Sequence, residues 1–243
     1  MENNTSNYEY KNVVQINETD ASRKFLANVF MWMFVALGIS ALCSYTFTTN
    51  DNFRAQIIDP ATHSFTGLGF LAMIAPLAFV LIMRFGLNKI AYPVLAVIFI
   101  AYAAVTGVSL SIILSIYTAS SVLGVFLTTS VVFGIMAIAG YTTQQDLTKF
   151  GSILIMFLIG IVVASLVNMF LHSSGLDMLI SYIGVAVFVG LTAYDVQRLK
   201  NIGAGLEYGD ATASKMALMG GLTLYLDFIN LFIMLLRVFG RRR

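Results

Sequence analysis

The sequence predicts an all-α membrane protein with seven transmembrane helices. Of its 243 residues, 58% are hydrophobic and 11% are charged, and that charged share is about half of the value for an average soluble protein. The apolar residues form unbroken runs of about 20 residues, the length that a helix needs to cross a bilayer. They do not alternate with polar residues, as the strands of a membrane β-barrel do. Because only helices and closed barrels satisfy their backbone hydrogen bonds in lipid, the runs are expected to be helices.

Three regions are expected along the chain: an N-terminal tail, one compact transmembrane domain and a short C-terminal end. Residues 1–24 are polar and lack the apolar core and cleavage site of a signal peptide, so they are interpreted as a cytosolic N-terminal tail. Residues 25–240 form the seven-helix transmembrane domain, and residues 241–243 are a basic C-terminal end. The connections are short except at 48–64 and 200–215. The expected spans are Phe25–Phe47, Phe65–Met83, Ile90–Ile116, Ser120–Gly140, Gly151–Leu171, Met178–Leu199 and Met216–Phe239.

The distribution of Lys and Arg predicts a cytosolic N-terminus, because cytoplasmic loops carry an excess of these residues. With that orientation, the loops on the opposite side hold only Arg54. One conflict remains, since a seventh full span would place Arg241, Arg242 and Arg243 outside. Either the last helix crosses despite these charges, as its length favours, or it re-enters and returns. The cytoplasmic basic residues would be Lys11, Arg23, Lys24, Arg84, Lys89, Lys149, Arg198, Lys200 and Lys215.

The seventh span is unusual because it carries Asp227 near its middle and Asn230 one turn later. An Asp at the centre of a spanning helix costs about 2.5–3.5 kcal/mol on insertion. Eleven Leu, Ile and Phe residues between Met216 and Leu236 oppose this cost, each by about 0.3–0.6 kcal/mol. The helix is therefore expected to insert with its polar stripe facing other helices or water, and not lipid.

A second intramembrane acid, Asp195, lies near the end of the sixth span. It either pairs at the interface with Arg198 or Lys200, or it meets Asp227 within the bundle. Two carboxylates in contact cannot both ionise cheaply, so they would share a proton and titrate as a unit. Protonated, the pair would link the two helices; deprotonated, the like charges would repel each other or attract a cation. If the two acids meet, we therefore interpret Asp195 and Asp227 as a pH-sensitive pair.

Other polar residues are weaker candidates. Arg84 ends the second span on the same predicted side and is either a counter-charge or an ordinary positive-inside anchor. Thr106 and Ser109 on the third span, together with Asn230, are candidates for a polar lining, although such hydroxyls commonly bond to carbonyls of their own helix. Cys43 is the only cysteine, so no disulfide or thiolate cluster forms within the chain. No patch typical of nucleic-acid binding is present.

No enzyme is expected, although two membrane aspartates are also the catalytic pair of aspartyl intramembrane proteases. Tyr194 and Asp195 match the first motif of presenilin-like proteases, but Leu224-Tyr225-Leu226-Asp227 lacks the glycines of the second motif. The sequence contains no HExxH motif, phosphate-binding glycine loop or Ser/His/Asp signature. No cofactor is expected.

Four stretches carry a resemblance to a known family: ALMGGLTLYLDFINLFIMLLRVFG at 217–240, LTAYDVQRLK at 191–200, VTGVSLSII at 105–113 and DLTKFGSIL at 146–154. In these stretches, and over nearly everything from the first span onward, the chain resembles the Bax inhibitor-1 (transmembrane Bax inhibitor motif) family, and its bacterial branch most closely.

The resemblance implies a fold in which the last helix is central and is wrapped by the other six. It also implies a pH-sensitive calcium leak that acid promotes. Asp195 and Asp227 would be the di-aspartyl sensor and a transient calcium site, and Arg84 would be the arginine that latches onto them. One departure concerns a second-span glutamate of some bacterial relatives. The corresponding region around Met73 is uncharged here, so cation entry would be weaker or follow another route.

These expectations combine into one hypothesis and one rival. The hypothesis is a passive, proton-gated calcium leak channel in a bacterial cytoplasmic (inner) membrane, with membrane lipid, calcium ions and protons as its partners. The rival is a membrane regulator without transport of its own, which binds a membrane protease or a cell-death partner through its N-terminal tail and the 200–215 loop. Nothing in the sequence excludes the rival.

Overall fold

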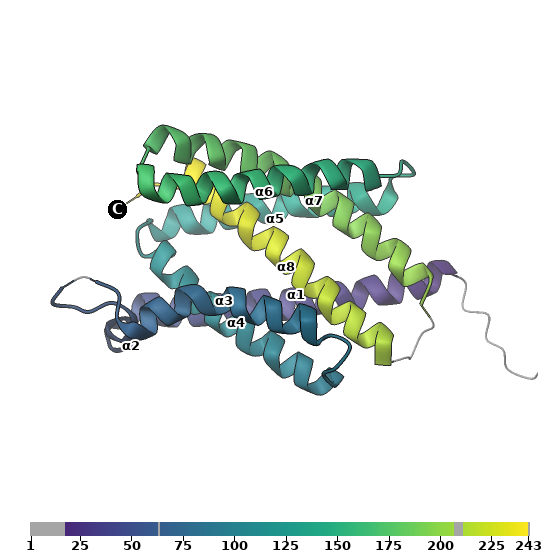
Figure 1. The fold of residues 1–243 in the computed structure, drawn as a ribbon, viewed down its shortest axis with the longest axis horizontal. Helices are drawn as coiled ribbons and strands as arrows, with labels where there is room; N and C mark the ends of the chain where they lie inside the picture. Colours follow the sequence, from purple (N-terminus) through teal and green to yellow (C-terminus); the bar gives the residue numbers. More distant parts are fainter. Residues whose placement is uncertain (1–17, 63, 207–210, 243) are drawn as a thin grey trace, which may run out of the picture.

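The computed structural model describes residues 18–62, 64–206 and 211–242, which fold into eight α-helices (Figure 1). Seven of the helices in this part of the chain are long and apolar enough to cross a membrane. The all-α, seven-span prediction is therefore confirmed. The helices are α1 (Glu18–Thr49), α2 (Asp51–Ile57), α3 (Gly67–Gly86), α4 (Tyr92–Leu114), α5 (Ala119–Thr142), α6 (Thr148–Leu171), α7 (Ser174–Ala204) and α8 (Ala211–Phe239).

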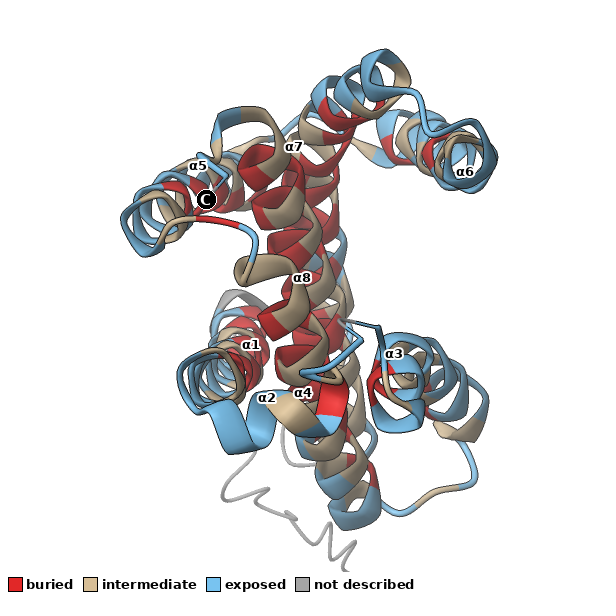
Figure 2. Cartoon of the chain, turned by 90° about the vertical axis from the view of Figure 1, so that its left-hand side faces the viewer, coloured by how far each residue is buried: buried red, intermediate tan, exposed pale blue. Residues whose placement is uncertain are grey.

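Helix α8 runs through the centre of the molecule. Figure 2 shows it between one group formed by α1, α3 and α4 and a second group formed by α5, α6 and α7. Its main contacts are with α1, α4, α5 and α7, whereas α3 packs on α4 and α6 packs on α7. The central last helix that the resemblance implied is confirmed, with α3 and α6 in outer positions.

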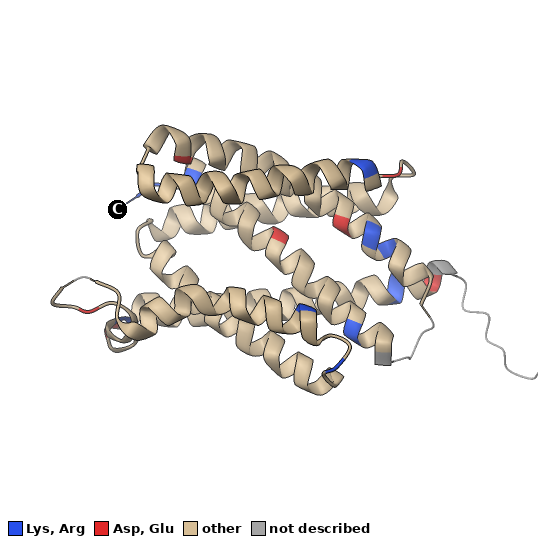
Figure 3. Ribbon diagram, in the orientation of Figure 1, with Lys and Arg blue, Asp and Glu red and all other residues tan. Residues whose placement is uncertain are grey.

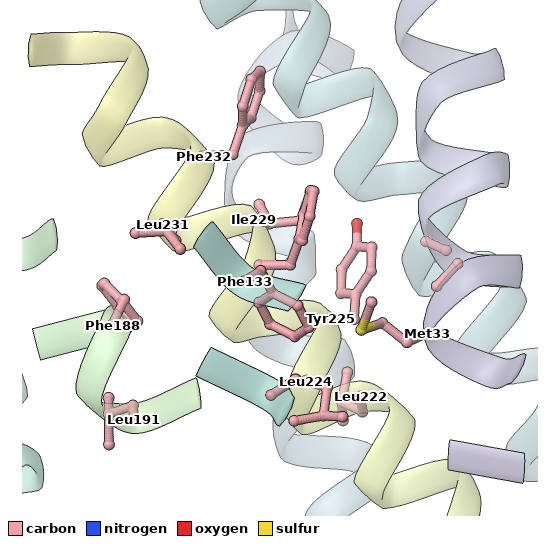
Figure 4. Close-up of a cluster of buried hydrophobic side chains, with 14 of the residues drawn as sticks. Met33, Phe133, Phe188, Leu191, Leu222, Leu224, Tyr225, Ile229, Leu231 and Phe232 are labelled. Atoms are coloured by element: carbon pink, nitrogen blue, oxygen red, sulfur yellow. The ribbon is translucent and has the colours of Figure 1, made fainter. Parts of the chain in front are cut away.

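Burial follows this arrangement. Five leucines of α8 are fully buried together with Tyr225 (Leu218, Leu222, Leu224, Leu231 and Leu236). Figure 4 shows how side chains from α5, α7 and α1 surround this part of α8, with Phe133, Phe188 and Met33 around Leu224 and Tyr225. Large apolar side chains on α3, α5 and α6 are instead exposed. Since apolar side chains gain nothing from burial when the surrounding solvent is hydrocarbon, these exposed faces are the lipid-facing surface.

Helix α1 begins at Glu18, earlier than the expected Phe25, so residues 18–24 are helical and do not belong to a tail. Ala21 and Ser22 are buried, and the Ser22 hydroxyl donates to the Lys200 carbonyl at 2.9 Å. This contact with the end of α7 explains why the polar start of the sequence continues the helix. Residues 1–17 of the expected tail lie outside the described residues.

The loop expected at 48–64 contains the short helix α2, which hydropathy could not reveal. The Asn50 side chain caps it by accepting from the Asn52 N–H at 3.0 Å. Thr66 caps α3 in the same way, accepting from the Gly69 N–H at 3.1 Å. Helices α7 and α8 also extend beyond the expected spans, because polar helical turns continue past the apolar run that defines a span.

Helix α8 crosses the whole bundle, so the re-entrant alternative is wrong. After α8 ends, the Arg241 carbonyl accepts from the Thr118 N–H at 3.0 Å, and the Arg241 N–H donates to the Ser121 hydroxyl at 2.9 Å. Thr118 and Ser121 lie at the start of α5, at the end of the bundle opposite the start of α1 (Figure 1). The two ends of the described chain therefore lie on opposite sides of the bundle.

Candidate functional site

The two intramembrane acids meet where α7 packs against α8. Asp195 lies on α7 and Asp227 on α8, and each residue is more than nine-tenths buried. Their carboxyl groups are within hydrogen-bonding contact. The Asp227 Oδ2 atom is buried and has no hydrogen-bond partner among the described residues. Figure 3 shows a red segment within a long uncharged stretch of α8, and another on α7 beside blue segments of the same helix.

Helix packing brings the pair together. The interior face of α7 carries Ser181, Gly184, Thr192 and Asp195, all of them buried. Its position is fixed by α5, which crosses α7 so closely that a Cβ built on Gly140 would lie 2.1 Å from the Ala193 carbonyl oxygen. Only a glycine permits that approach, because no side chain fits between the two backbones. This packing holds the polar interior face of α7 against α8.

Two arginines lie near the carboxyl pair without neutralising it fully. The Arg198 Nη1 atom is 4.0 Å from Asp195 Oδ1, and the Arg198 side chain is 59% exposed. Arg84, at the end of α3, is exposed and lines a cavity of about 320 Å³ together with Asp195 and Arg198. Among the described residues, no ion pair within 4 Å joins Arg84 to either acid. Arg84 therefore faces the acids across this cavity, while Arg198 is in marginal contact.

Asp195 lies next to both Arg198 and Asp227. Each of the two alternatives for this residue, an ion pair at the interface or contact with the second acid, therefore describes one of its neighbours. Lys200 does not take part. Its amine donates to the Tyr141 carbonyl at 2.8 Å and lies 4.9 Å from the centre of the Tyr141 ring.

The three candidate lining residues do not gather at the acids. Thr106 is buried and donates to the Tyr102 carbonyl one turn earlier in α4, at 2.8 Å. Asn230 similarly donates to the Leu226 carbonyl of α8 at 2.8 Å. The Ser109 hydroxyl bonds to the Ala72 carbonyl and so joins α4 to α3. In this conformation these groups serve helix contacts and their own helix, and none of them points into an open channel lined by the acids.

A hydrogen-bonded cluster that the sequence analysis missed lies two residues before Asp227. The Ser40 hydroxyl of α1 donates to the Ala103 carbonyl of α4 at 2.7 Å. It therefore accepts from the Tyr225 hydroxyl of α8, also at 2.7 Å. Tyr102 packs edge-on against Tyr225, with ring centroids 5.7 Å apart. A tyrosine inside an apolar helix is the signal that could have found this cluster, since a buried Tyr hydroxyl usually has a partner.

Comparison with known proteins agrees with this architecture. The family model described as "Inhibitor of apoptosis-promoting Bax1" matches residues 22–243. The chain belongs to the Bax inhibitor-1 family. It is 45% identical over 222 residues to the inner membrane protein YbhL of Escherichia coli K12, an alignment that covers 90% of this chain and 92% of YbhL. A protein of Borreliella burgdorferi is 46% identical over 221 residues (90% of this chain and 93% of that protein), and the Rickettsia prowazekii protein RP147 is 39% identical over 223 residues (91% of each chain).

This Bax inhibitor-1 family member is thus an integral membrane protein, and it carries a second charged contact at the other end of α8. Arg237 Nη1 lies 3.0 Å from Asp177 Oδ1, and both side chains are about one-third exposed. Asp177 stands in the first turn of α7, where a negative charge also interacts favourably with the helix dipole. No local sequence pattern connects Arg237 with Asp177, because the two residues are 60 positions apart. Asp227 therefore lies near the middle of α8 and Arg237 in its last turn.

The ligand set around the carboxyl pair is small. Within the described residues, no group of three or more His, Cys, Asp or Glu side chains is arranged to hold a metal ion. Two carboxylates supply oxygen ligands of the kind that calcium prefers, but calcium normally takes six to eight ligands. The pair can therefore contribute at most part of a coordination shell, with the remainder coming from water or backbone carbonyls. Such a site suits an ion in transit better than a stored one.

Proposed function

We propose that this protein is a passive, proton-gated calcium leak channel of a bacterial cytoplasmic membrane, with its N-terminus in the cytosol. The observation that supports the proposal is the contact between two buried carboxyl groups on the central helix and its neighbour. A carboxylate within a membrane span is costly and is by default functional. The orientation rests on the basic residues, which gather at the end of the bundle where α1 starts (Figure 3).

The gate works through the charge of the pair. When the pair is ionised, it attracts Arg84 and Arg198, which line the same cavity. That attraction holds α3 and α7 together at the end of the bundle where both arginines lie. Protonation removes the negative charge and releases the arginines, so acid increases the flux. Calcium follows its own gradient, and carboxylate oxygens lower the cost of removing its water.

The test is calcium uptake by proteoliposomes that enclose a calcium-sensitive dye, measured over a range of pH. We expect wild-type flux to rise as the pH falls. Asp227→Asn cannot ionise at this position and leaves Asp195 as the only titratable group of the pair, so we expect the pH dependence of its flux to be much weaker than that of wild type. Asp51→Asn is the matched control, because Asp51 is an exposed aspartate whose side chain is 91% accessible, and it should keep the wild-type pH profile. Equal, pH-independent flux from wild type and Asp227→Asn would refute the gate.

A second candidate function is suggested by the description of the family model, which names an inhibitor of a cell-death protein. In that role the protein would bind a membrane partner and transport nothing. The two functions are separated by the purified protein alone: flux without any added partner supports the channel. Absence of flux, together with a phenotype lost on deletion of the N-terminal tail, supports the regulator.

A further inference from the structure

A polar pocket on the outer side of α7 is separate from the cavity that Asp195 lines. It has a volume of about 390 Å³ and lies between the start of α6 and the end of α7. Five of its six lining residues are polar: Thr148, Tyr194, Gln197, Arg198 and Asn201. Such a concentration of hydrogen-bonding side chains is unusual on a molecule whose outer surface is mostly apolar. The pocket is therefore suited to a polar group presented at the membrane surface.

The pocket lies at one end of two candidate spans. Its residues belong to the first turn of α6 and the last turns of α7, so we expect it near the level of the lipid headgroups. Helix α6 is the least buried of the spans, with 11% of its apolar window inside the protein. Lipid therefore surrounds α6, and headgroups have direct access to the pocket beside it.

The donors that remain available favour an anion. Gln197 is committed to the α5–α6 connection: its side chain accepts from the Leu147 N–H at 2.9 Å and donates to the Gln145 carbonyl at 2.7 Å. The Thr148 hydroxyl donates to Asp146 at 2.5 Å. The Arg198 guanidinium, the Asn201 amide and the Tyr194 hydroxyl supply the other donors of the pocket. An anionic oxygen is the ligand that such a set binds most strongly.

Asp146 limits the charge of that anion. Hydrogen bonds from the Thr148 hydroxyl and N–H lower the pKa of Asp146, so this carboxyl at the mouth of α6 is ionised. Its repulsion acts more strongly on free phosphate, which carries about −1.5 to −2 charges near neutral pH in the same way as a phosphate monoester, than on a phosphodiester with a single charge. A lipid phosphodiester fits the pocket better than free phosphate does.

Arg198 connects this pocket to the carboxyl pair, since it lines both cavities and contacts Asp195 at 4.0 Å. We propose that the pocket binds the phosphodiester headgroup of an anionic phospholipid, and that the bound headgroup draws Arg198 away from Asp195. The second half rests on the proposed function. Because Arg198 is 59% exposed, its side chain is free to move between the two partners. Anionic lipid then regulates the gate by removing one of the two arginines that restrain it.

Binding is tested on the full chain by native mass spectrometry with phosphatidylglycerol or phosphatidylcholine added in detergent. We expect phosphatidylglycerol to be retained preferentially. A basic residue near a membrane surface contributes about 1 kcal/mol to the binding of acidic lipid, so Arg198→Gln should lose about fivefold in retention. Asn201→Ala should lose part of it. Arg23→Gln is the matched control: Arg23 is an exposed arginine at the same end of the bundle, and its substitution should change retention little.

Three outcomes would overturn the pocket: equal retention of both lipids, equal losses in Arg198→Gln and Arg23→Gln, or displacement of phosphatidylglycerol by an equimolar amount of inorganic phosphate. The last result would assign the pocket to free phosphate.

Calcium flux at one acidic pH then tests the regulation. It should be higher in phosphatidylglycerol vesicles than in phosphatidylcholine vesicles, and Asn201→Ala should reduce this difference. Lipid binding without any calcium flux would refute the channel but support the lipid-binding pocket. Calcium flux without a preference for anionic lipid would support the channel but refute the pocket.

Discussion

Single polar atoms inside the bundle matter most where no water can replace a lost partner. The Ser40 hydroxyl joins three helices, because it accepts from Tyr225 of α8 and donates to the Ala103 carbonyl of α4. Ser40 is 2% exposed and Tyr225 is fully buried. Removing one partner leaves a buried hydroxyl unsatisfied, which costs more than the hydrogen bond itself contributes.

Ser40→Ala should therefore lower the free energy of unfolding by about 1–3 kcal/mol, since it leaves the Tyr225 hydroxyl unpaired. Tyr225→Phe should cost less, about 0.5–1.5 kcal/mol, because Ser40 keeps its bond to Ala103. Denaturant unfolding in mixed micelles measures both values. Ser130→Ala is the control: its hydroxyl is exposed and bonds only to the Phe126 carbonyl of its own helix. Equal costs for Ser40→Ala and Ser130→Ala would contradict the cluster.

At the residue scale, the sequence was informative about charge and uninformative about partners. Asp227 stood out because an acid in an apolar helix is costly, and hydropathy alone reveals that cost. Ser40 and Tyr225 carry no such signal, since a hydroxyl in a membrane helix is cheap and its partner lies 185 positions away. Thr106 and Asn230 were candidates for a polar lining, and spacing alone cannot separate that role from the hydrogen bonds that they make to their own helices.

At the scale of the helices, close crossings depend on glycines that face a neighbouring backbone. Gly140 of α5 meets the Ala193 carbonyl of α7, and Gly107 of α4 meets Ser40 of α1. Neither position leaves room for a Cβ. Both contacts lie within a few residues of a functional or structural cluster, so a shift of either helix would move Asp195 or Ser40.

Gly140→Ala should therefore be strongly destabilising, by about 3 kcal/mol or more, because the new Cβ would displace α5 from the α7 backbone. Gly124 is a matched position on the same helix, with nothing within 4 Å of an added Cβ. Gly124→Ala should be neutral or stabilising by up to about 1 kcal/mol, since alanine favours the helix. Thermal unfolding of the two variants in detergent provides the comparison. Similar melting temperatures would show that α5 and α7 do not cross as closely as described.

The helices themselves were the easiest feature to predict, and their ends were the hardest. Runs of apolar residues identify spans because the bilayer has a fixed thickness. They do not report helical turns that continue into polar surroundings, as at Glu18 of α1 and Ala211 of α8. The short helix α2 was missed for the same reason. Its N-cap at Asn50 is a local hydrogen bond that hydropathy does not register.

At the scale of the whole molecule, the complete crossing of α8 decides the topology. Seven spans place the two ends of the described chain on opposite sides of the membrane, and Arg241 and Arg242 follow the last span. The cytosolic N-terminus that we propose would put these arginines outside, an exception that the positive-inside pattern tolerates because orientation is set by the sum over all loops and usually by the first helix.

Cysteine labelling can check that topology. Cys43 is the only native cysteine, so Cys43→Ser gives a background in which Lys89→Cys and Arg242→Cys are compared. Both residues are exposed and lie at opposite ends of the bundle. A membrane-impermeant maleimide added to intact cells should label Arg242→Cys and leave Lys89→Cys unmodified. Labelling of both positions from the same side would contradict the full crossing of α8.

The central position of the last helix also determines when the helix bundle can finish folding. Ribosomes deliver α8 after every other span has been synthesised and inserted. Until then, α1 and α4 on one side and α5 and α7 on the other lack the helix between them and are joined through the packing of α1 on α7. The first six spans therefore wait without their central helix, with Asp195 still lacking Asp227. Assembly is therefore completed only when translation ends, and a chain truncated before α8 would present an unfinished core to quality-control proteases.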